Sequence, residues 1–207
     1  MKRTKDDTAR TRAIVLDAAA DAFYENGVSR TSLDHIAKRA GLTRGAIYWH
    51  FKDKADLLTA LHSDTMLPQE CLLLEAMANA SDDPLDMIES GGVRFLHDFE
   101  TDERLQRVHA IVTLGCEFIG ESRETISRVI AADEGMHNHL KQILEMAEQK
   151  GDLNPEWSSE TATRALQCCM SGLLTEWLKS GKAFPLSTVG TMVLKGLFQS
   201  FRKPGTA

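Results

Sequence analysis

Apolar side chains recur every three to four positions along most of the chain, which is the spacing of a helix that buries one face. In residues 8–27 the apolar positions include Ile14, Ala18 and Phe23, and Gly27 follows as a stop signal. No segment alternates apolar and polar residues as a strand does, and no internal repeat is visible. The sequence therefore predicts an all-α fold of about nine helices. Their expected positions are 8–27, within 28–41, 44–51, from 54 with a kink at Pro68, 84–100, 102–118, 124–151, 158–181 and 186–201.

The two short helices that follow the first one are joined by a turn of three to four residues containing Gly41. This is the spacing of a helix-turn-helix motif, and glycine can adopt the left-handed turn conformation without steric cost. Thr31 or Ser32 can cap the first of the two helices, and Thr43 can cap the second. A helical hairpin whose aromatic residues only fill a core is the alternative.

Charge is distributed unevenly between this segment and the remainder. The whole chain has a net charge of −6, but residues 1–54 hold eleven Lys and Arg against seven Asp and Glu. A basic segment attached to an acidic remainder indicates local contact with a polyanion. We therefore expect a helix-turn-helix DNA-binding domain at 1–53, followed by a second, acidic domain at 54–207.

The second short helix lies in "GLTRGAIYWHF", residues 41–51, which holds three of the thirteen Phe, Tyr and Trp residues of the chain. Helical spacing turns Ile47 inward, together with Leu42 and Phe51. The remaining side chains then face outward. An arginine can donate to guanine edges or phosphates, a glycine lets backbones approach, and a tyrosine hydroxyl can donate to phosphate. The expected outward residues of this recognition helix are Arg44, Gly45, Tyr48, Trp49 and His50.

Other features exclude several classes of protein. No apolar run approaches the roughly 20 residues that span a bilayer, and the charged amino end has no apolar stretch after it, so we expect a cytoplasmic protein without membrane contact. The sequence has no H-E-x-x-H, G-x-S-x-G or Walker motif, and the two histidines of "HNH" at 137–139 fall on different helix faces. We expect no enzyme activity, no cofactor and no metal site. The cysteines Cys71, Cys116, Cys168 and Cys169 are expected to be buried free thiols, with a redox switch at Cys168–Cys169 as the alternative.

The run "TSLDHIAKRAGLTRGAIYWHFKDKADLL", residues 31–58, resembles the DNA-binding segment of the TetR family of bacterial repressors. It is especially similar to the AcrR-type repressors of multidrug efflux; the similarity covers about the first 60 residues, with a weaker match in "CEF" at 116–118. The resemblance implies that the recognition helix approaches bases and phosphates and that the second and fourth helices touch the DNA backbone. It also implies a basic amino-terminal arm, for which a solvated terminus is the alternative. The implied DNA-binding residues are Thr31 or Ser32, Thr43, Arg44, Gly45, Tyr48, Trp49, His50, Lys54, Lys2, Arg3 and Lys5.

The last two predicted helices carry apolar residues on more than one face, so each needs two partners. One helix-turn-helix contacts few base pairs, and such proteins bind as homodimers to an inverted repeat in double-stranded DNA. The resemblance implies a four-helix dimer bundle here, whereas burial of both helices in a monomer core is the alternative. The candidate dimer residues are Leu173, Leu178, Val189, Val193, Leu197, Phe198 and Phe201.

The central helices, roughly 54–180, combine methionines with isolated polar groups on their inner faces, which suits hydrophobic or cationic small molecules. For each such residue, ordinary core packing is the alternative. Glu117 has apolar neighbours and needs a partner, either a cationic ligand or an arginine such as Arg94, Arg107 or Arg164. Gly91–Gly92 leaves room for a ligand, permits a bend, or ends a helix. The candidate effector residues are Met66, Gln69, Phe95, His109, Thr113, Glu117, Met136, Leu140, Gln167, Met170, Ser171 and Trp177.

Together with these features, the resemblance implies that 54–207 is an effector-binding and dimerisation domain. It also implies that the protein is a repressor, of a multidrug efflux operon, that leaves its operator when a small molecule binds. Effector binding would move the kinked fourth helix so that the two recognition helices no longer match the groove spacing, and a coupling of roughly 1–3 kcal/mol is sufficient. A DNA-binding regulator controlled by a protein partner or by cysteine redox state is the alternative.

Overall fold

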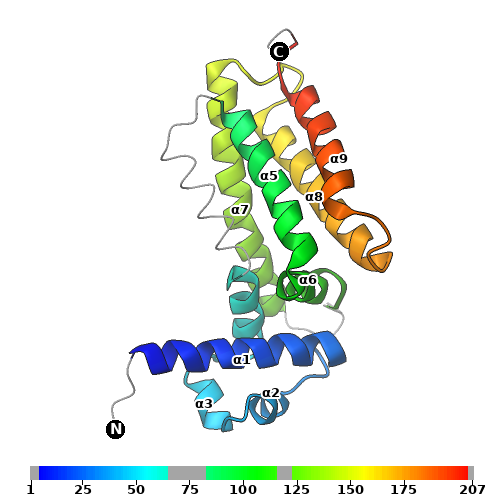
Figure 1. Cartoon of the computed structure of the whole chain (residues 1–207). Helices are drawn as coiled ribbons and strands as arrows, with labels where there is room; N and C mark the ends of the chain where they lie inside the picture. Colours follow the sequence, from blue (N-terminus) through cyan, green and yellow to red (C-terminus); the bar gives the residue numbers. More distant parts are fainter. Residues whose placement is uncertain (1–4, 65–82, 116–122, 205–207) are drawn as a thin grey trace. The chain divides into compact units, whose positions relative to one another are not determined.

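The protein is all-helical over the residues that its structure, a computed structural model, describes. These are residues 5–64, 83–115 and 123–204, with side chains described for 6–64, 83–113 and 134–204. The all-α prediction is confirmed, and Figure 1 shows the arrangement of the helices. In chain order they are α1 (Lys5–Asn26), α2 (Leu33–Arg39), α3 (Arg44–Tyr48), a helix at 54–64, α5 (Pro84–Thr101), α6 (Glu103–Ala110), the π-helical turn η1 (Ile111–Gly115), α7 (Arg123–Lys150), α8 (Ser159–Lys179) and α9 (Leu186–Phe201).

The helix boundaries agree with the sequence signals at most positions. Gly27 and Gly41 follow α1 and α2 with φ angles of 79° and 66°, the left-handed conformation that ends a helix. The helix expected at 102–118 differs, because its α-helical part ends at Ala110 and a π-helical turn follows. Pro68, where a kink was expected, lies outside the described residues. None of the described helices is long and apolar enough to cross a membrane.

The expected weak point at Gly91–Gly92 is instead a continuous part of α5. A Cβ atom added at Gly92 would lie 3.1 Å from Leu194 Cδ1 on α9, and one added at Gly190 on α9 would lie 2.5 Å from Leu96 Cδ1 on α5. Gly92 and Gly190 therefore allow close packing of α5 against α9. The helix-end interpretation of Gly91–Gly92 is wrong.

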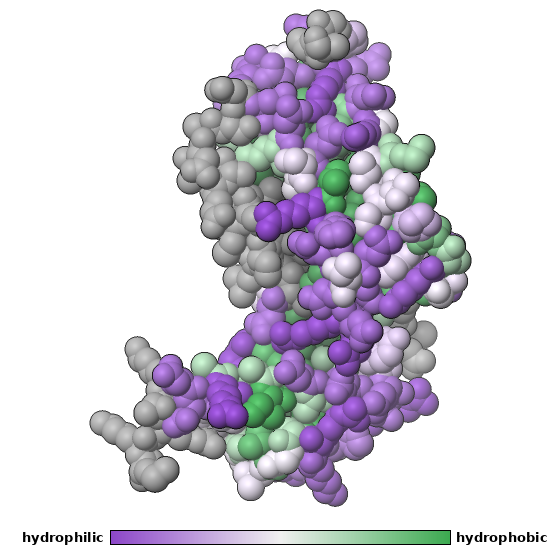
Figure 2. Space-filling model, viewed as in Figure 1, coloured by the Kyte–Doolittle hydropathy of each residue, from purple (hydrophilic) through white to green (hydrophobic). Residues whose placement is uncertain are grey.

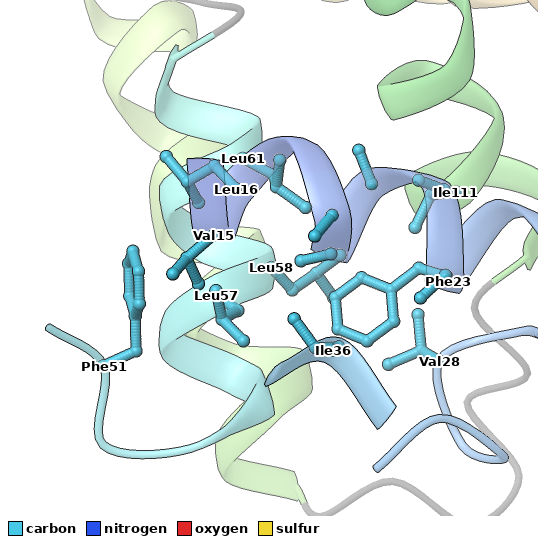
Figure 3. Packing of buried hydrophobic residues seen from close by; sticks show 14 of the residues in the cluster. Val15, Leu16, Phe23, Val28, Ile36, Phe51, Leu57, Leu58, Leu61 and Ile111 are labelled. Carbon is cyan, nitrogen blue, oxygen red and sulfur yellow. The ribbon is translucent and has the colours of Figure 1, made fainter. Parts of the chain in front are cut away.

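The described residues fall into two compact units: residues 5–64 with 107–115 and 123–132, and residues 83–106 with 133–204. In the first unit, α1 to α3 surround one hydrophobic core, seen in Figure 3. The helix at 54–64 contributes Leu57, Leu58 and Leu61 to the same core. By packing, therefore, this helix belongs with the first three, whereas the sequence analysis placed a boundary after residue 53. The largest completely buried side chains of this core are those of Leu16, Phe23, Ile36, Ile47, Leu57, Leu58 and Leu61.

The second unit has its own core between α5, α7, α8 and α9, which run alongside one another in Figure 1. Trp177 on α8 lies edge-on to Phe99 on α5, with ring centroids 6.0 Å apart, and its indole N–H donates to the carbonyl of Phe184 at 2.8 Å. Phe198 and Phe201 on α9 are completely buried in this core. They were expected at a dimer surface, and the structure corrects this, because they have no exposed surface left for a partner.

The amino end of α9 is capped by Glu100, at the end of α5. The residue before α9 is Pro185, which supplies no side-chain cap. The Glu100 carboxylate accepts from the backbone N–H groups of Leu186 at 2.7 Å and Ser187 at 3.2 Å, and from the Ser187 hydroxyl. The Ser187 hydroxyl bond, followed by the backbone bonds, lowers the pKa of Glu100 below its ordinary value of 4.5, against the opposing effect of partial burial. This carboxylate therefore fixes α9 to the end of α5.

Candidate nucleic-acid interface

The turn between α2 and α3 is built from local hydrogen bonds. Ser32 caps α2, its hydroxyl accepting from the backbone N–H of His35 at 3.1 Å. After Gly41, the Leu42 N–H donates to the carbonyl of Ala37 at 2.9 Å, and the Thr43 hydroxyl then caps α3 by accepting from Ala46 N–H at 3.3 Å. The expected helix-turn-helix geometry is therefore present, with Ser32 and Thr43 as the two capping residues.

Ile47 is the buried residue that anchors the short helix α3 in the core. Ile47 is 0% exposed and Phe51, just after the helix, is buried with it, while Leu42 packs against the same core. On the other side, Tyr48 is 47% exposed and Trp49 is 65% exposed. Two adjacent exposed aromatic side chains form a small apolar surface on this face of the motif, which is available for contact with a ligand. The expected division between inward and outward residues is confirmed except at His50, which was expected outside and is half-buried.

Arg44 lies at the start of the outward face of α3 and is held in place by two neighbours. Its guanidinium donates to the Tyr48 hydroxyl at 3.0 Å, lies 5.3 Å from the centre of the Tyr48 ring, and pairs with Asp34 of α2 at 3.3 Å. The Tyr48 hydrogen bond, followed by the Asp34 charge, raises the pKa of Arg44 above its already high value. The side chain is thus always charged and partly ordered before any ligand arrives, while remaining exposed to solvent.

Two of the predicted DNA contacts have structural roles within the chain. Thr31 is buried, and its hydroxyl donates to the carbonyls of Gly27 at 2.8 Å and Ala22 at 3.2 Å, so it closes the end of α1. Of the alternatives Thr31 and Ser32, only Ser32 is at the surface. The Lys54 ammonium donates to the carbonyls of Val28 at 2.8 Å and Ser29 at 3.2 Å, which ties the helix at 54–64 to the loop before α2.

The remaining predicted contacts are placed as follows. Gly45 is exposed on α3, and His50 is half-buried with its ring edge-on to Trp49 at 4.7 Å between centroids. Lys5 is the first residue of α1, and its side chain, like residues Lys2 and Arg3, lies outside the described part of the chain.

The candidate effector residues are only partly brought together. In the second unit Phe95, Met136, Leu140, Gln167 and Met170 are half-buried, Trp177 is buried and Ser171 is exposed. Phe95 contacts Phe99, with centroids 5.8 Å apart, and Phe99 in turn contacts Trp177. His109 and Thr113 belong to the first unit, where the Thr113 hydroxyl donates to the His109 carbonyl at 2.7 Å. Met66, Gln69 and Glu117 lie outside the described residues.

One polar residue of the second unit was missed by the sequence analysis. His137 on α7 is buried, and its Nδ1 lies 2.9 Å from Gln167 Oε1 on α8. The sequence analysis used His137 only to show that it and His139 fall on different faces of one helix. A single buried histidine has no sequence signal that separates it from a surface one.

The three arginines considered as partners for Glu117 each pair with another carboxylate. Arg94 lies 4.0 Å from Asp98 within α5, and Arg164 lies 3.3 Å from Glu160 within α8. Arg107, at the end of α6, forms a 2.6 Å ion pair with Asp21 of α1. The structure thus gives Arg107 a long-range partner that the sequence analysis did not foresee.

An apolar surface remains on α9. Met192 is 71% exposed and Val193 is 41% exposed, and Val189 lies beside them on the same helix face. In Figure 2, hydrophobic and pale atoms lie along the right edge of the upper part over α9, next to hydrophilic residues. Of the other expected dimer residues, Leu173, Leu178 and Leu197 are half-buried.

A capped helix-turn-helix with an exposed arginine and two exposed aromatic residues defines a DNA-binding protein of the helix-turn-helix class. Residues 15–61 match the family described as "Bacterial regulatory proteins, tetR family", and residues 83–202 match "MAATS-type transcriptional repressor, C-terminal region". The chain is 39% identical over 204 residues to the HTH-type transcriptional repressor BepR of Brucella suis, covering 99% of this chain and 98% of that one. The chain therefore belongs to the TetR family of bacterial transcriptional regulators.

Solved structures agree with this assignment. NalD, the secondary repressor of the MexAB-OprM multidrug efflux pump in Pseudomonas aeruginosa, superposes with a TM-score of 0.85 at 33% identity, covering 96% of this chain and all of that one. SmeT, the repressor of the Stenotrophomonas maltophilia pump SmeDEF, superposes in its complex with triclosan with a TM-score of 0.84 at 28% identity, covering 95% and 93%. The resemblance to efflux repressors extends beyond the first 60 residues to nearly the whole chain.

Proposed function

We propose that this protein represses a multidrug efflux operon in the bacterial cytoplasm and leaves its operator when a small apolar molecule binds. The observation that carries the proposal is the exposed face of α3. Arg44, Tyr48 and Trp49 point away from a helix that Ile47 anchors, in a chain of the TetR family. Relatives that repress efflux pumps support the assignment of the regulated genes.

In this proposal α3 enters the major groove of an operator half-site. Arg44 reaches base edges, Gly45 and Thr43 let the helix start approach the duplex, and Tyr48 and Trp49 lie against sugar or phosphate. Ser32 and His50 contact the phosphate backbone, with Lys54 contributing through the loop that it holds. Lys2, Arg3 and Lys5 add affinity that does not depend on base sequence.

The proposal also requires two copies, because one short recognition helix reads few base pairs. The exposed face of α9 around Met192 and Val193 is the candidate dimer surface, with Val189, Leu197, Leu173 and Leu178 at its margins.

Met192→Glu tests this surface, because a charge placed in a packed apolar interface is costly to desolvate. We expect the variant to sediment as a monomer at micromolar concentration with unchanged helix content by circular dichroism, and to lose operator binding. Lys150→Glu, at the exposed end of α7, is the matched control and should stay dimeric. A dimeric Met192→Glu variant would place the interface elsewhere.

The effector is proposed to be a hydrophobic or cationic small molecule that binds the second unit near Phe95 and Trp177. SmeT in complex with triclosan supports an apolar ligand, and the aromatic cluster of Phe95, Phe99 and Trp177 supplies a suitable surface. Release follows from a population shift, in which the ligand favours a conformation whose recognition helices do not fit the operator.

The test begins with selection of preferred sites from random duplex DNA, which yields the operator without knowledge of the genome. Fluorescence anisotropy then measures operator affinity with and without triclosan, ethidium and a plant phenolic. We expect at least one compound to weaken binding by about 5- to 150-fold. Selection of an inverted repeat that no compound in the panel releases would favour control by a protein partner or by redox state.

Redox control has weak structural support. Cys168 was expected to be buried, and the structure corrects this, because its side chain is exposed on α8. Cys169 is half-buried on the same helix, and burial raises the pKa of its thiol. Cys71 and Cys116 lie outside the described residues. A raised pKa lowers the fraction of reactive thiolate. Equal operator affinity with and without a reducing agent would exclude this form of control.

A further inference from the structure

Asp34 of α2 places a negative charge beside the arginine that is proposed to read the operator. It lies in the first turn of α2 and is exposed. A carboxylate on a surface that approaches phosphates opposes binding, because like charges repel one another. Asp34 must therefore contribute something other than attraction to the duplex, and its contacts with Arg44 indicate what that is.

The Asp34 carboxylate contacts the Arg44 guanidinium at two nitrogens. Its Oδ1 lies 3.3 Å from Nε, and its Oδ2 accepts a hydrogen bond from Nη1 at 3.3 Å. The third nitrogen, Nη2, donates to the Tyr48 hydroxyl at 3.0 Å, and the Tyr48 ring centre lies 5.3 Å from the guanidinium carbon. Contact at more than one point restricts the plane of a guanidinium as well as its position. Asp34 and Tyr48 therefore orient Arg44 from two sides.

These contacts leave N–H groups of Arg44 for a base. Each terminal nitrogen of an arginine carries two N–H groups. Nη1 directs one to Asp34 and Nη2 directs one to Tyr48, so each of these nitrogens retains a second. Guanine presents two acceptors, O6 and N7, in the major groove, and an arginine contacts both with two such donors. Arg44 can therefore contact a guanine with Asp34 and Tyr48 still beside it.

The separation of the two charged partners is set by the buried side of the helix-turn-helix. Ile36 on α2 and Ile47 on α3 are completely buried in the same core, and the Leu42 N–H donates to the Ala37 carbonyl across the turn at 2.9 Å. Both charged side chains are exposed, so solvent weakens their ion pair and it contributes little to stability. Its main effect is on the orientation of the Arg44 side chain.

We propose that Asp34 is a positioning residue that makes operator binding depend on a guanine at the base contacted by Arg44. A guanidinium held in one plane offers its donors in one direction, so another base at that position leaves them unpaired. Without Asp34, Arg44 can turn toward a phosphate or a neighbouring base, and the repulsion of phosphates is lost as well. Asp34 therefore raises the ratio of operator affinity to affinity for unrelated DNA. This inference rests on the proposed function.

The position of Asp34 also has an ordinary structural explanation, which the test must separate from this one. A carboxylate in the first turn of a helix interacts favourably with the amino end of that helix. Asp34→Glu retains this charge but moves the carboxylate away by the length of one methylene group. A purely structural role predicts wild-type DNA binding for Asp34→Glu, whereas a positioning role predicts weaker discrimination between bases.

Base-specific binding by the full-length protein tests the proposal. The operator selected from random duplexes is synthesised with deazaguanine, in which carbon replaces N7, at one symmetric pair of guanines at a time. An unrelated duplex of the same length gives the non-specific affinity. Fluorescence anisotropy compares wild type with Asp34→Asn, Asp34→Glu, Arg44→Ala and the double variant of Asp34→Asn with Arg44→Ala. Asp17→Asn, at an exposed position on α1 of the same unit, is the matched charge control.

We expect deazaguanine at the base read by Arg44 to weaken wild-type binding by about 5- to 150-fold. Arg44→Ala should show no loss at that base, which identifies it. Asp34→Asn should show a loss there at least about threefold smaller than that of wild type, and should bind the unrelated duplex about two- to fivefold more tightly.

The remaining variants separate positioning from charge. In the Arg44→Ala background, Asp34→Asn should not change the effect of deazaguanine any further, because it acts through Arg44. Asp34→Glu should bind the unrelated duplex as wild type does but lose less than wild type on deazaguanine substitution. Asp17→Asn should keep the full wild-type loss.

The full wild-type loss in Asp34→Asn, at the base that Arg44→Ala identifies, would overturn the inference and leave the proposed function standing. An equal gain in affinity for the operator and the unrelated duplex would also overturn it, since charge alone explains that result. The same holds if Arg44→Ala abolishes the loss at no guanine of the operator. If wild-type protein selects no inverted repeat, the proposed function fails and the inference fails with it.

Discussion

Replacing Arg44 with alanine removes the only charged side chain of α3 and leaves the helix itself intact. Arg44 is exposed, whereas the residue that anchors α3 is Ile47, so the substitution does not disturb the core. The Thr43 cap and the Gly41 turn also remain. Any change in operator affinity therefore reports on the contact surface of α3.

The expected loss of operator affinity is the difference between the contact that Arg44 makes with the DNA and the contacts within the protein that it weakens on binding. A well-placed arginine at a base edge contributes about 1–3 kcal/mol per half-site. Against this stands the partial loss of its exposed contacts with Asp34 and Tyr48, which at this exposure contribute about 0–1 kcal/mol. The substitution therefore removes a net binding free energy of about 1–2 kcal/mol per half-site. Over the two half-sites bound by a dimer, this loss weakens binding by roughly 30- to 700-fold.

Fluorescence anisotropy over a series of salt concentrations measures this loss and its origin. If Arg44 reads a base edge, the affinity for the operator falls while non-specific affinity and the salt slope change little. Lys179→Ala, which removes one positive charge from the end of α8, controls for net charge. Operator affinity of Arg44→Ala within twofold of wild type would remove Arg44 from the reading surface and refute the reasoning.

Two further predictions concern the second unit. Gly190→Ala should destabilise the protein by about 1–3 kcal/mol in thermal unfolding, because the new methyl group would meet Leu96 at 2.5 Å, whereas Gly91→Ala, with no atom within 4 Å, should stabilise it by about 0.5–1 kcal/mol. Equal effects of the two substitutions would contradict the close approach of α5 and α9. Glu100→Gln should cost about 1 kcal/mol at pH 7, because it weakens the cap of α9. Since the pKa of Glu100 is lowered below 4.5, its contribution is present above that pH and is lost as the pH falls through the folded value, so the difference from wild type should shrink in acid. A difference that stays the same from pH 7 to pH 3 would show that ionisation of Glu100 does not matter.

Much of this architecture could be predicted because its signals are local. Helical periodicity and the stop signals at Gly27 and Gly41 depend on neighbours in sequence, and the structure confirms the helices that they delimit. The inward position of Ile47 and the outward positions of Arg44 and Trp49 follow from the same helical spacing.

The predictions were wrong where packing between distant segments determines the position of a residue. Thr31 and Ser32 are equally good capping residues by sequence, and only the fold shows that Thr31 bonds to carbonyls at the end of α1. The apolar residues of α9 cover more than one face, so the sequence could not tell that Phe198 belongs to the core while Met192 is exposed. Glycine at position 92 weakens a helix in isolation, but close packing against Leu194 requires a small residue there.

The ion pair between Arg107 of α6 and Asp21 of α1 had no sequence signal. Asp21 and Arg107 are 86 positions apart, and each resembles an ordinary surface charge. Periodicity reveals which side of a helix is apolar, but it does not reveal which charged residues meet across the fold.

Footprinting of the purified protein on the DNA upstream of its own gene tests the central claim most directly, namely that α3 reads duplex DNA in symmetric pairs. The account predicts a protected inverted repeat whose half-sites are separated by about one helical turn, or a multiple of it, with protection lost in Arg44→Ala. Absence of protection, or protection of one half-site without its symmetric partner, would contradict it.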